Sequence, residues 1–142
     1  MLRILIIAPF LILPVLLYIL TAMSAGSGGT AASLGATLFS MPMMSGRSWL
    51  FTLGDLLLLA GLLCLFAEIL KAVRTKGDSL VNHALSMFVL LFCLIAFLAM
   101  PGFQTSVFFL LTIMALLDVV AGPILSIVAA RRDFGIGEGM GS

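Results

Sequence analysis

The sequence predicts an all-α membrane protein, a bundle of four transmembrane helices with the N-terminus and the C-terminus both cytoplasmic. Of its 142 residues, 63% are hydrophobic and only 9% are charged, whereas soluble domains are about 45–50% apolar and about 25% charged. A water-soluble fold of this length could not hide so much apolar surface, so the bilayer must be the solvent. Four apolar stretches supply the spans, and the basic residues between them supply the orientation.

Each predicted span has the length of a helix that crosses a hydrocarbon core of about 30 Å. A lone apolar segment satisfies its backbone only as a helix, which excludes strands. The leucine run at 56–59 also lacks the alternation of a barrel strand. The spans form one domain over residues 1–130 and are expected at Ile4–Ala22, Trp49–Leu70, Leu80–Met100 and Thr105–Ala129.

The first span has a second interpretation, as a signal peptide. Arg3 precedes an apolar run, and small residues follow it at 22–25. Signal peptides have this order of features, but their apolar core is usually about 7–15 residues long. The run here is longer and contains Pro9 and Pro14. An uncleaved helix is therefore favoured, and cleavage would leave three spans with the same orientation.

The connections between spans differ in character. The outer loop, 23–48, begins rich in Ser, Gly, Ala and Thr, so little favours an ordered structure there. Trp49 follows it at the place of an interfacial aromatic residue. The turn at 101–104 is short and makes the last two spans an antiparallel hairpin. On the other side lie the inner loop, 71–79, and a glycine-rich tail, 131–142, which is expected to be flexible.

The basic residues are distributed unevenly between the two sides. With four spans, only Arg47 lies on the outer side. The positive-inside rule then places the N-terminus, the inner loop and the tail in the cytoplasm. The residues on that side are Arg3, Lys71, Arg74, Lys76, Arg131 and Arg132.

The sequence carries no catalytic, nucleotide or metal motif, and no cofactor is expected. A net charge of +1 offers no field for nucleic acid. Cys64 and Cys93 lie in apolar runs at different depths, so they are interpreted as small core residues without a disulfide. A lone histidine cannot by itself make a zinc or haem site.

Asp118 is the residue that most needs an explanation. It lies one residue past the midpoint, residue 117, of the 105–129 span, where a charge costs about 2.5–3.5 kcal/mol on insertion scales. It must find a partner, reach trapped water or stay protonated. Its stripe is small and polar, so it faces the bundle or a subunit interface as a proton or cation site or as a structural hydrogen-bonder. The stripe is Ala115, Asp118, Gly122, Ser126 and Ala129.

Asp55 is the second acid expected inside the hydrocarbon, about four residues outward of the middle of its span. Helix rise separates it from Asp118 by roughly 6–8 Å along the membrane normal. Two acids that faced each other would share a proton or bind a cation. The alternative is that Asp55 pairs with Arg47 or with outer water.

Glu68 and His83 form a third candidate, a pair at the cytoplasmic interface. Glu68 ends the second span and His83 begins the third. Lys71, one turn after Glu68, is a further partner at a common pair spacing. His83 could switch charge near neutral pH. The alternative is a histidine simply hydrogen-bonded to Glu68 or to water.

Two other spans also carry one small or polar stripe each. Three helices with one inward face each are typical of a small left-handed bundle. Phe88 and Phe92 project elsewhere, toward lipid. The stripes are Gly54, Gly61 and Glu68 in the second span, and Asn82, Ser86, Val89, Cys93 and Ala96 in the third.

Three short runs, at 54–59, 68–72 and 130–135, resemble those of small uncharacterised four-span inner-membrane proteins of proteobacteria. This resemblance implies a multi-pass protein of the bacterial inner (cytoplasmic) membrane and supplies no activity. The small multidrug exporters, another four-span family, rely on a glutamate in the first span. The first span here has no acidic residue.

These observations predict a non-enzymatic membrane protein that serves as an accessory, assembly or minor subunit of a membrane complex. Its partners would be membrane lipid and either another membrane protein or further copies of itself, with no nucleic acid. The alternative is a small proton- or cation-coupled transporter or channel that uses Asp118 and Asp55. Quinone or lipid binding between helices needs few polar groups and stays open.

Overall fold

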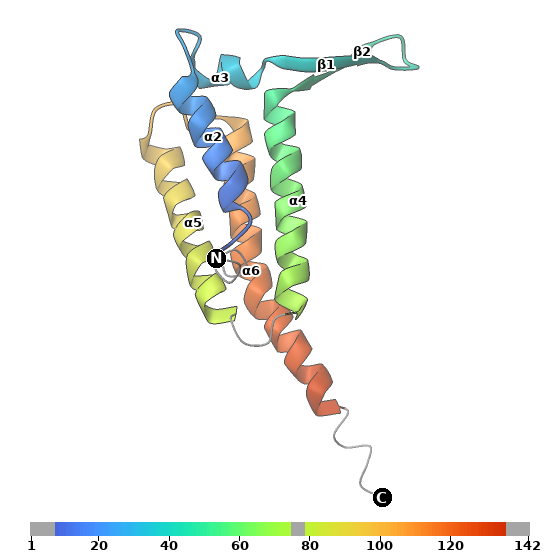
Figure 1. The fold of residues 1–142 in the computed structure, drawn as a ribbon, viewed down its shortest axis with the longest axis vertical. Coiled ribbons are helices and arrows are strands. Elements are labelled where there is room, and N and C mark those ends of the chain that lie inside the picture. The colour runs from blue at the N-terminus through green and yellow to red at the C-terminus, as the bar shows by residue number, and fades with distance from the viewer. Residues whose placement is uncertain (1–7, 75–78, 136–142) are drawn as a thin grey trace, which may run out of the picture.

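The computed structural model describes residues 8–74 and 79–135, with side-chain surroundings for 8–72, 81–124 and 127. It is mostly helical, with one small two-stranded sheet at an end of the bundle (Figure 1). The elements, labelled as in Figure 1, are α2 (Ile12–Ser24), α3 (Gly29–Leu34), β1 (Thr37–Pro42), β2 (Ser48–Thr52), α4 (Leu53–Arg74), α5 (Ser79–Ala99) and α6 (Ser106–Gly135).

Within the described ranges, three helices are long and apolar enough to cross a membrane, over Leu53–Ala72, Val81–Ala99 and Ser106–Ile124. The mostly helical structure and these three segments agree with the coarser part of the prediction, a helical protein whose long helices could span a membrane. Helix α2 is also apolar but has only 13 residues, about 20 Å at 1.5 Å per residue. Residues 4–7 of the predicted first span, Ile4–Ala22, lie outside the described residues.

The prediction that the outer loop, 23–48, is unordered is wrong. It contains α3 and, from Thr37, the first strand of a β-hairpin. The hairpin turn is closed by a hydrogen bond from the Met43 amide to the Arg47 carbonyl at 2.8 Å. Gly46, with φ +78°, takes the left-handed conformation that this turn needs and that glycine adopts without strain. Trp49 accordingly lies in β2, and the second span begins later, at Leu53.

Two predicted boundaries on the other side also change. Helix α4 continues to Arg74, so the inner loop expected at 71–79 is shorter, and 75–78 lie outside the described residues. Helix α6 continues to Gly135 through Pro123, so the tail expected from 131 begins as helix. Leucine, alanine and arginine favour continuation of a helix once it has started. The glycine-rich part, 136–142, is outside the described ranges.

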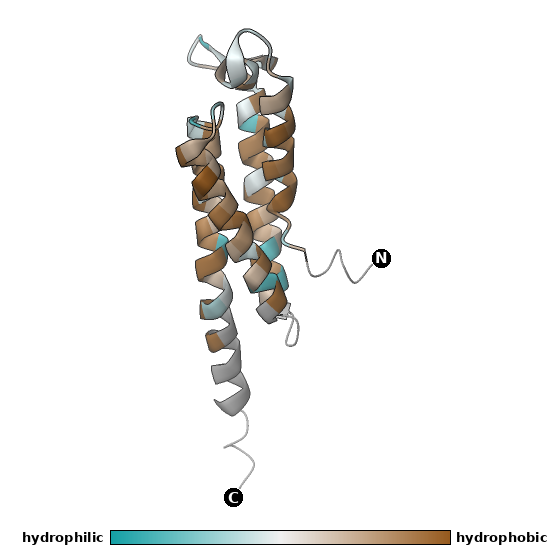
Figure 2. Ribbon diagram, turned by 90° about the vertical axis from the view of Figure 1, so that its left-hand side faces the viewer, coloured by the Kyte–Doolittle hydropathy of each residue, from teal (hydrophilic) through white to brown (hydrophobic). Residues whose placement is uncertain are grey.

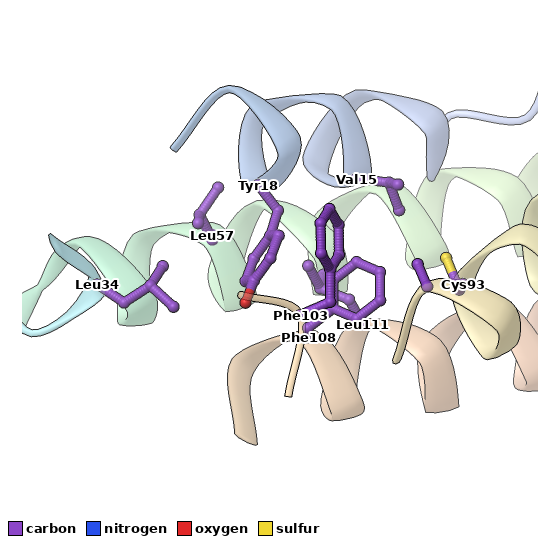
Figure 3. Close-up of a cluster of buried hydrophobic side chains, with 9 residues drawn as sticks. Val15, Tyr18, Leu34, Leu57, Cys93, Phe103, Phe108 and Leu111 are labelled. Atoms are coloured by element: carbon purple, nitrogen blue, oxygen red, sulfur yellow. The ribbon is translucent and has the colours of Figure 1, made fainter. Parts of the chain in front are cut away.

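The apolar core ties α2 to the turn between α5 and α6 (Figure 3). Tyr18 is fully buried, and its ring centroid lies 4.7 Å from that of Phe108 and 5.5 Å from that of Phe103. The Tyr18 hydroxyl donates to the Gly102 carbonyl at 2.9 Å and lies 2.7 Å from Thr105 Oγ1. A buried tyrosine thus keeps a polar partner while its ring fills the core.

Helices α4 and α6 approach closely along the glycine stripe of α4. A Cβ on Gly61 would lie 2.7 Å from Leu111 Cδ2 and 2.9 Å from Met114 Sδ. A Cβ on Gly54 would lie 2.9 Å from Val107 Cγ2. Small residues allow such contact between membrane helices. The inward faces predicted for α4 and α5 are confirmed by the burial of Gly54, Gly61, Glu68, Ser86, Cys93 and Ala96.

Candidate functional site

One small polar chamber lies between α4, α5 and α6. The helices are hydrophobic along most of their length, and hydrophilic positions gather toward the end of the bundle at which α4 ends (Figure 2). The chamber has a volume of about 20 Å³, close to what a single water molecule needs. Its lining residues are Glu68, Ala72, Asn82, His83, Ser86, Asp118 and Gly122.

Glu68 is the best-connected residue of the chamber. It is 1% exposed, and its Oε1 accepts a hydrogen bond from Asn82 Nδ2 at 2.7 Å. Lys71 Nζ forms an ion pair with the same oxygen at 2.8 Å. The other oxygen, Oε2, accepts from the backbone amide of Phe10 at 3.0 Å. A buried carboxylate is tolerated because its charge is paired and both oxygens are hydrogen-bonded.

Lys71 extends this network to the segment before α2. Its Nζ donates to the Ala8 carbonyl at 3.1 Å and lies 4.7 Å from the centroid of the Phe10 ring, within range of a cation–π contact. The side chain is 12% exposed. Glu68 and Lys71 together therefore hold the start of α2 against the end of α4.

Asp118 completes the chamber from α6 and is 8% exposed. Its carboxyl group lies beside the Ser86 hydroxyl and near enough to Glu68, Lys71 and His83 to interact with their charges. Asp118 lines the same chamber as Glu68, so the two acids lie at a similar level in the bundle. That Asp118 lies at the bilayer centre stays a prediction.

Two polar atoms of the chamber lack a partner within the part of the chain that the structure describes. They are Asn82 Oδ1 and Ser86 Oγ, and both are buried. Ser86 lies beside Asp118 without meeting full hydrogen-bond geometry to it. A buried polar atom without a partner costs about 1–3 kcal/mol, so these atoms mark a place for a small polar guest.

The formal charges of the chamber do not cancel when both acids are ionised. Glu68 and Asp118 supply two negative charges, and Lys71 supplies one positive charge. With His83 neutral, one negative charge remains among the side chains that the structure describes here. A proton, a small cation or a positively charged His83 would balance this negative charge, so the chamber is a candidate site for a proton or a cation.

The structure joins two sites that the sequence analysis kept separate. Asp118 and Gly122 of α6 meet Glu68 and His83 around the same chamber. The direct partner of Glu68 from α5 is Asn82, while His83 lines the cavity with its Nδ1 near Gly122. The stripe continues along α6 at Ser126 and Ala129, whose side chains fall outside the described set.

Asp55 does not belong to this site. It lies in the first turn of α4, and its Oδ2 accepts from the Thr52 amide at 2.9 Å and from Thr52 Oγ1 at 2.8 Å. The Asp55 amide donates back to Thr52 Oγ1 at 3.2 Å. This reciprocal pair is a capping box. The interpretation of Asp55 as an ion-site acid, or as a partner of Arg47, is replaced by a helix cap.

Sequence reasoning missed the roles of five residues. Asn82 and Ser86, four residues apart on the inward face of α5, were recognised as a polar stripe but not as chamber residues. Thr52, three residues before Asp55, carries a capping signature that could have identified the cap. The backbone groups of Phe10 and Ala8 leave no signal in the side-chain pattern.

No candidate metal cluster of histidine, cysteine or acidic residues occurs in the described ranges, and both cysteines are free. Comparison with models of known families, with curated proteins and with solved structures finds no match for this chain.

Proposed function

We propose that this protein is a small, non-enzymatic, multi-pass protein of the bacterial inner membrane that serves as an accessory, assembly or minor subunit of a membrane complex. In this proposal α2, completed by the residues before it, is a fourth span, and both termini are cytoplasmic. One observation carries the proposal: Glu68 and Asp118 line one small chamber of about 20 Å³ between three helices, and Glu68 is fully partnered there. Polar groups used in this way hold helices together.

The outer sides of the helices support the same role. Phe88 and Leu98 of α5 are 69% and 76% exposed, while Cys93 and Ala96 on the opposite side are fully buried. A broad apolar side is what lipid or another membrane helix contacts.

Site-specific photo-crosslinking in the native membrane tests this role. A photoreactive side chain at Phe88 points outward, and the same group at Cys93 points into the core and is the matched control. We expect one discrete protein adduct from an outward position in α4, α5 or α6 and none from position 93. Adducts only to lipid, or only to a second copy of this chain, from every outward position would contradict an accessory role.

A second candidate function is a proton- or cation-coupled transporter or channel built from several copies. The unbalanced acid and the two unpartnered oxygens of the chamber favour it. In this candidate Asp118 carries the proton or cation, and its guest is bound between α5 and α6. Four helices enclose little room, so the pathway would need more than one copy.

Flux measurements in liposomes test the second candidate. Asp118→Asn removes the carboxyl group that would carry the proton or cation. Asp55→Asn makes the same chemical change at a helix cap and is the matched control. We expect Asp118→Asn to abolish proton-linked flux and Asp55→Asn to leave it. Flux that survives Asp118→Asn, or no flux in the unmodified protein, would exclude this function.

A further inference from the structure

The β-hairpin at the start of α4 has two chemically different faces. Strands β1 and β2 are antiparallel, with Phe39 opposite Phe51 and Met41 opposite Trp49. Directly opposed residues project from the same side of a sheet. We call these four residues the aromatic face. The other side carries the pairs Ser40–Leu50 and Pro42–Ser48.

The three rings of the aromatic face contact one another. The centroids of Phe39 and Phe51 lie 4.8 Å apart in a stacked arrangement, and Trp49 meets Phe51 edge-on at 5.6 Å. On this face Phe39, Met41 and Trp49 are each about half exposed, at 48%, 49% and 47%, and Phe51 is partly buried. A contiguous exposed apolar patch of this kind marks a contact surface.

The junction between hairpin and helix is short and held by hydrogen bonds. Strand β2 ends at Thr52 and α4 begins at Leu53, with no linker between them. The Thr52–Asp55 capping box closes the junction, and the Leu53 amide donates to the Ala36 carbonyl at 3.0 Å. The orientation of the hairpin relative to α4 is therefore fixed.

This orientation determines where the hairpin lies in a membrane. Figure 1 shows it extending sideways from the start of α4, away from the bundle. Since α4 is long and apolar enough to cross a bilayer, a ribbon that extends sideways from its end would lie along the membrane surface. Aromatic rings are enriched at that depth, where acyl chains meet headgroups.

The charge of the hairpin fits the same location. Arg47, at the turn, is the single charged residue in positions 37–52. Its guanidinium group matches the phosphate of a lipid headgroup, and its long stem reaches toward the polar layer from an apolar surface. The serines at 40 and 48 lie on the other side of the ribbon.

We propose that the aromatic face of the hairpin rests on the lipid surface of the leaflet at the N-terminal end of α4. Phe39, Met41, Trp49 and Phe51 enter the boundary between headgroups and acyl chains, and Arg47 binds lipid phosphate. The ribbon thereby fixes the depth and rotation of α4. This inference goes beyond the accessory role and does not depend on it.

Trp49 is the chain's one tryptophan and reports directly on this contact. The full chain is reconstituted in vesicles of phosphatidylcholine and phosphatidylglycerol whose acyl chains carry bromine near the headgroup end or near the methyl end. We expect strong quenching by the bromines near the headgroup, weaker quenching by the deeper ones, and protection from acrylamide in the water. Quenching by acrylamide without quenching by brominated lipid would overturn the proposal, and so would shielding from both, which indicates protein cover.

A pair of variants tests which face is involved. Phe39→Asp places a charge on the aromatic face, and Leu50→Asp places it on the opposite face of the same ribbon. We expect Phe39→Asp to expose Trp49 to acrylamide and Leu50→Asp to leave its quenching unchanged. Equal exposure in both variants, or in neither, would overturn the assignment of the face. The quenching of the unmodified chain decides the lipid contact even if a variant fails to fold.

Discussion

Glu68 receives partners from three separate parts of the chain. The Phe10 amide comes from before α2, Lys71 from the next turn of α4, and Asn82 from α5. A single buried acid thus fixes the relative positions of these elements. Lys71 is itself nearly buried, so each member of the ion pair would be costly without the other.

Glu68→Gln should therefore destabilise the protein strongly. The amide cannot balance the Lys71 charge, and loss of one member of a buried pair costs about 3–5 kcal/mol. Unfolding by a denaturing detergent, followed by circular dichroism, measures the change. The Glu68→Gln, Lys71→Met double variant should recover part of the loss, because it removes the unpaired charge. A double variant no more stable than the single one would show that the pair is not what the substitution disrupts.

At the scale of the elements, the close packing of α4 against α6 depends on the absence of a side chain at Gly61. Gly61→Leu should cost about 1–3 kcal/mol, because it forces bulk against Leu111 and Met114. Gly61→Ala should cost less, since the ends of those two side chains can turn away. The same detergent unfolding measures both. Gly26→Leu is the control, as a Cβ there meets nothing within 4 Å; an equal loss there would contradict this packing.

The sequence predicted the helices and their inward faces well but not the β-hairpin. An apolar run longer than 18 residues and a buried stripe both repeat over several helical turns. Each further turn therefore strengthens the sequence signal for a helix. The hairpin has short strands with exposed side chains, so it gives only a weak sequence signal. The Ser- and Gly-rich beginning of the 23–48 segment instead predicts an unordered loop. Starting the second helix at Trp49 instead of Leu53 then placed Asp55 too deep and concealed its capping role.

The chamber was only half predictable for a related reason. Residue counting gives the depth of each acid along its own helix, but the register between helices depends on how side chains pack. The close approach of Gly54 and Gly61 to α6 sets that register and brings Glu68 level with Asp118. The register between two helices depends on how both of them pack, so the sequence of a single span does not contain it.

At the scale of the whole molecule, the number of crossings determines on which side each end lies. An even number of spans places both ends on the same side, and an odd number places them on opposite sides. The three long helices of the described ranges are long and apolar enough for three crossings from Leu53 onward, so a fourth crossing would have to come from the predicted Ile4–Ala22 span.

Reporter tags at the two ends test this parity. With four spans and the observed distribution of Lys and Arg, we expect an N-terminal and a C-terminal tag to be protected together in intact cells. A cysteine placed at Ser45, in the hairpin turn, should be labelled from outside once Cys64 and Cys93 are replaced by serine. Tags on opposite sides would show three crossings and would refute the four-span arrangement.

The contacts of Glu68 also bear on the order in which the protein enters the membrane. Phe10 is synthesised before Glu68, whereas Asn82 is synthesised after it. While α4 leaves the ribosome, its acid has only part of its final set of hydrogen bonds. An acid in lipid without them is costly. We therefore expect the insertion machinery to retain α4 until α5 arrives, and the two helices to pass into the bilayer together.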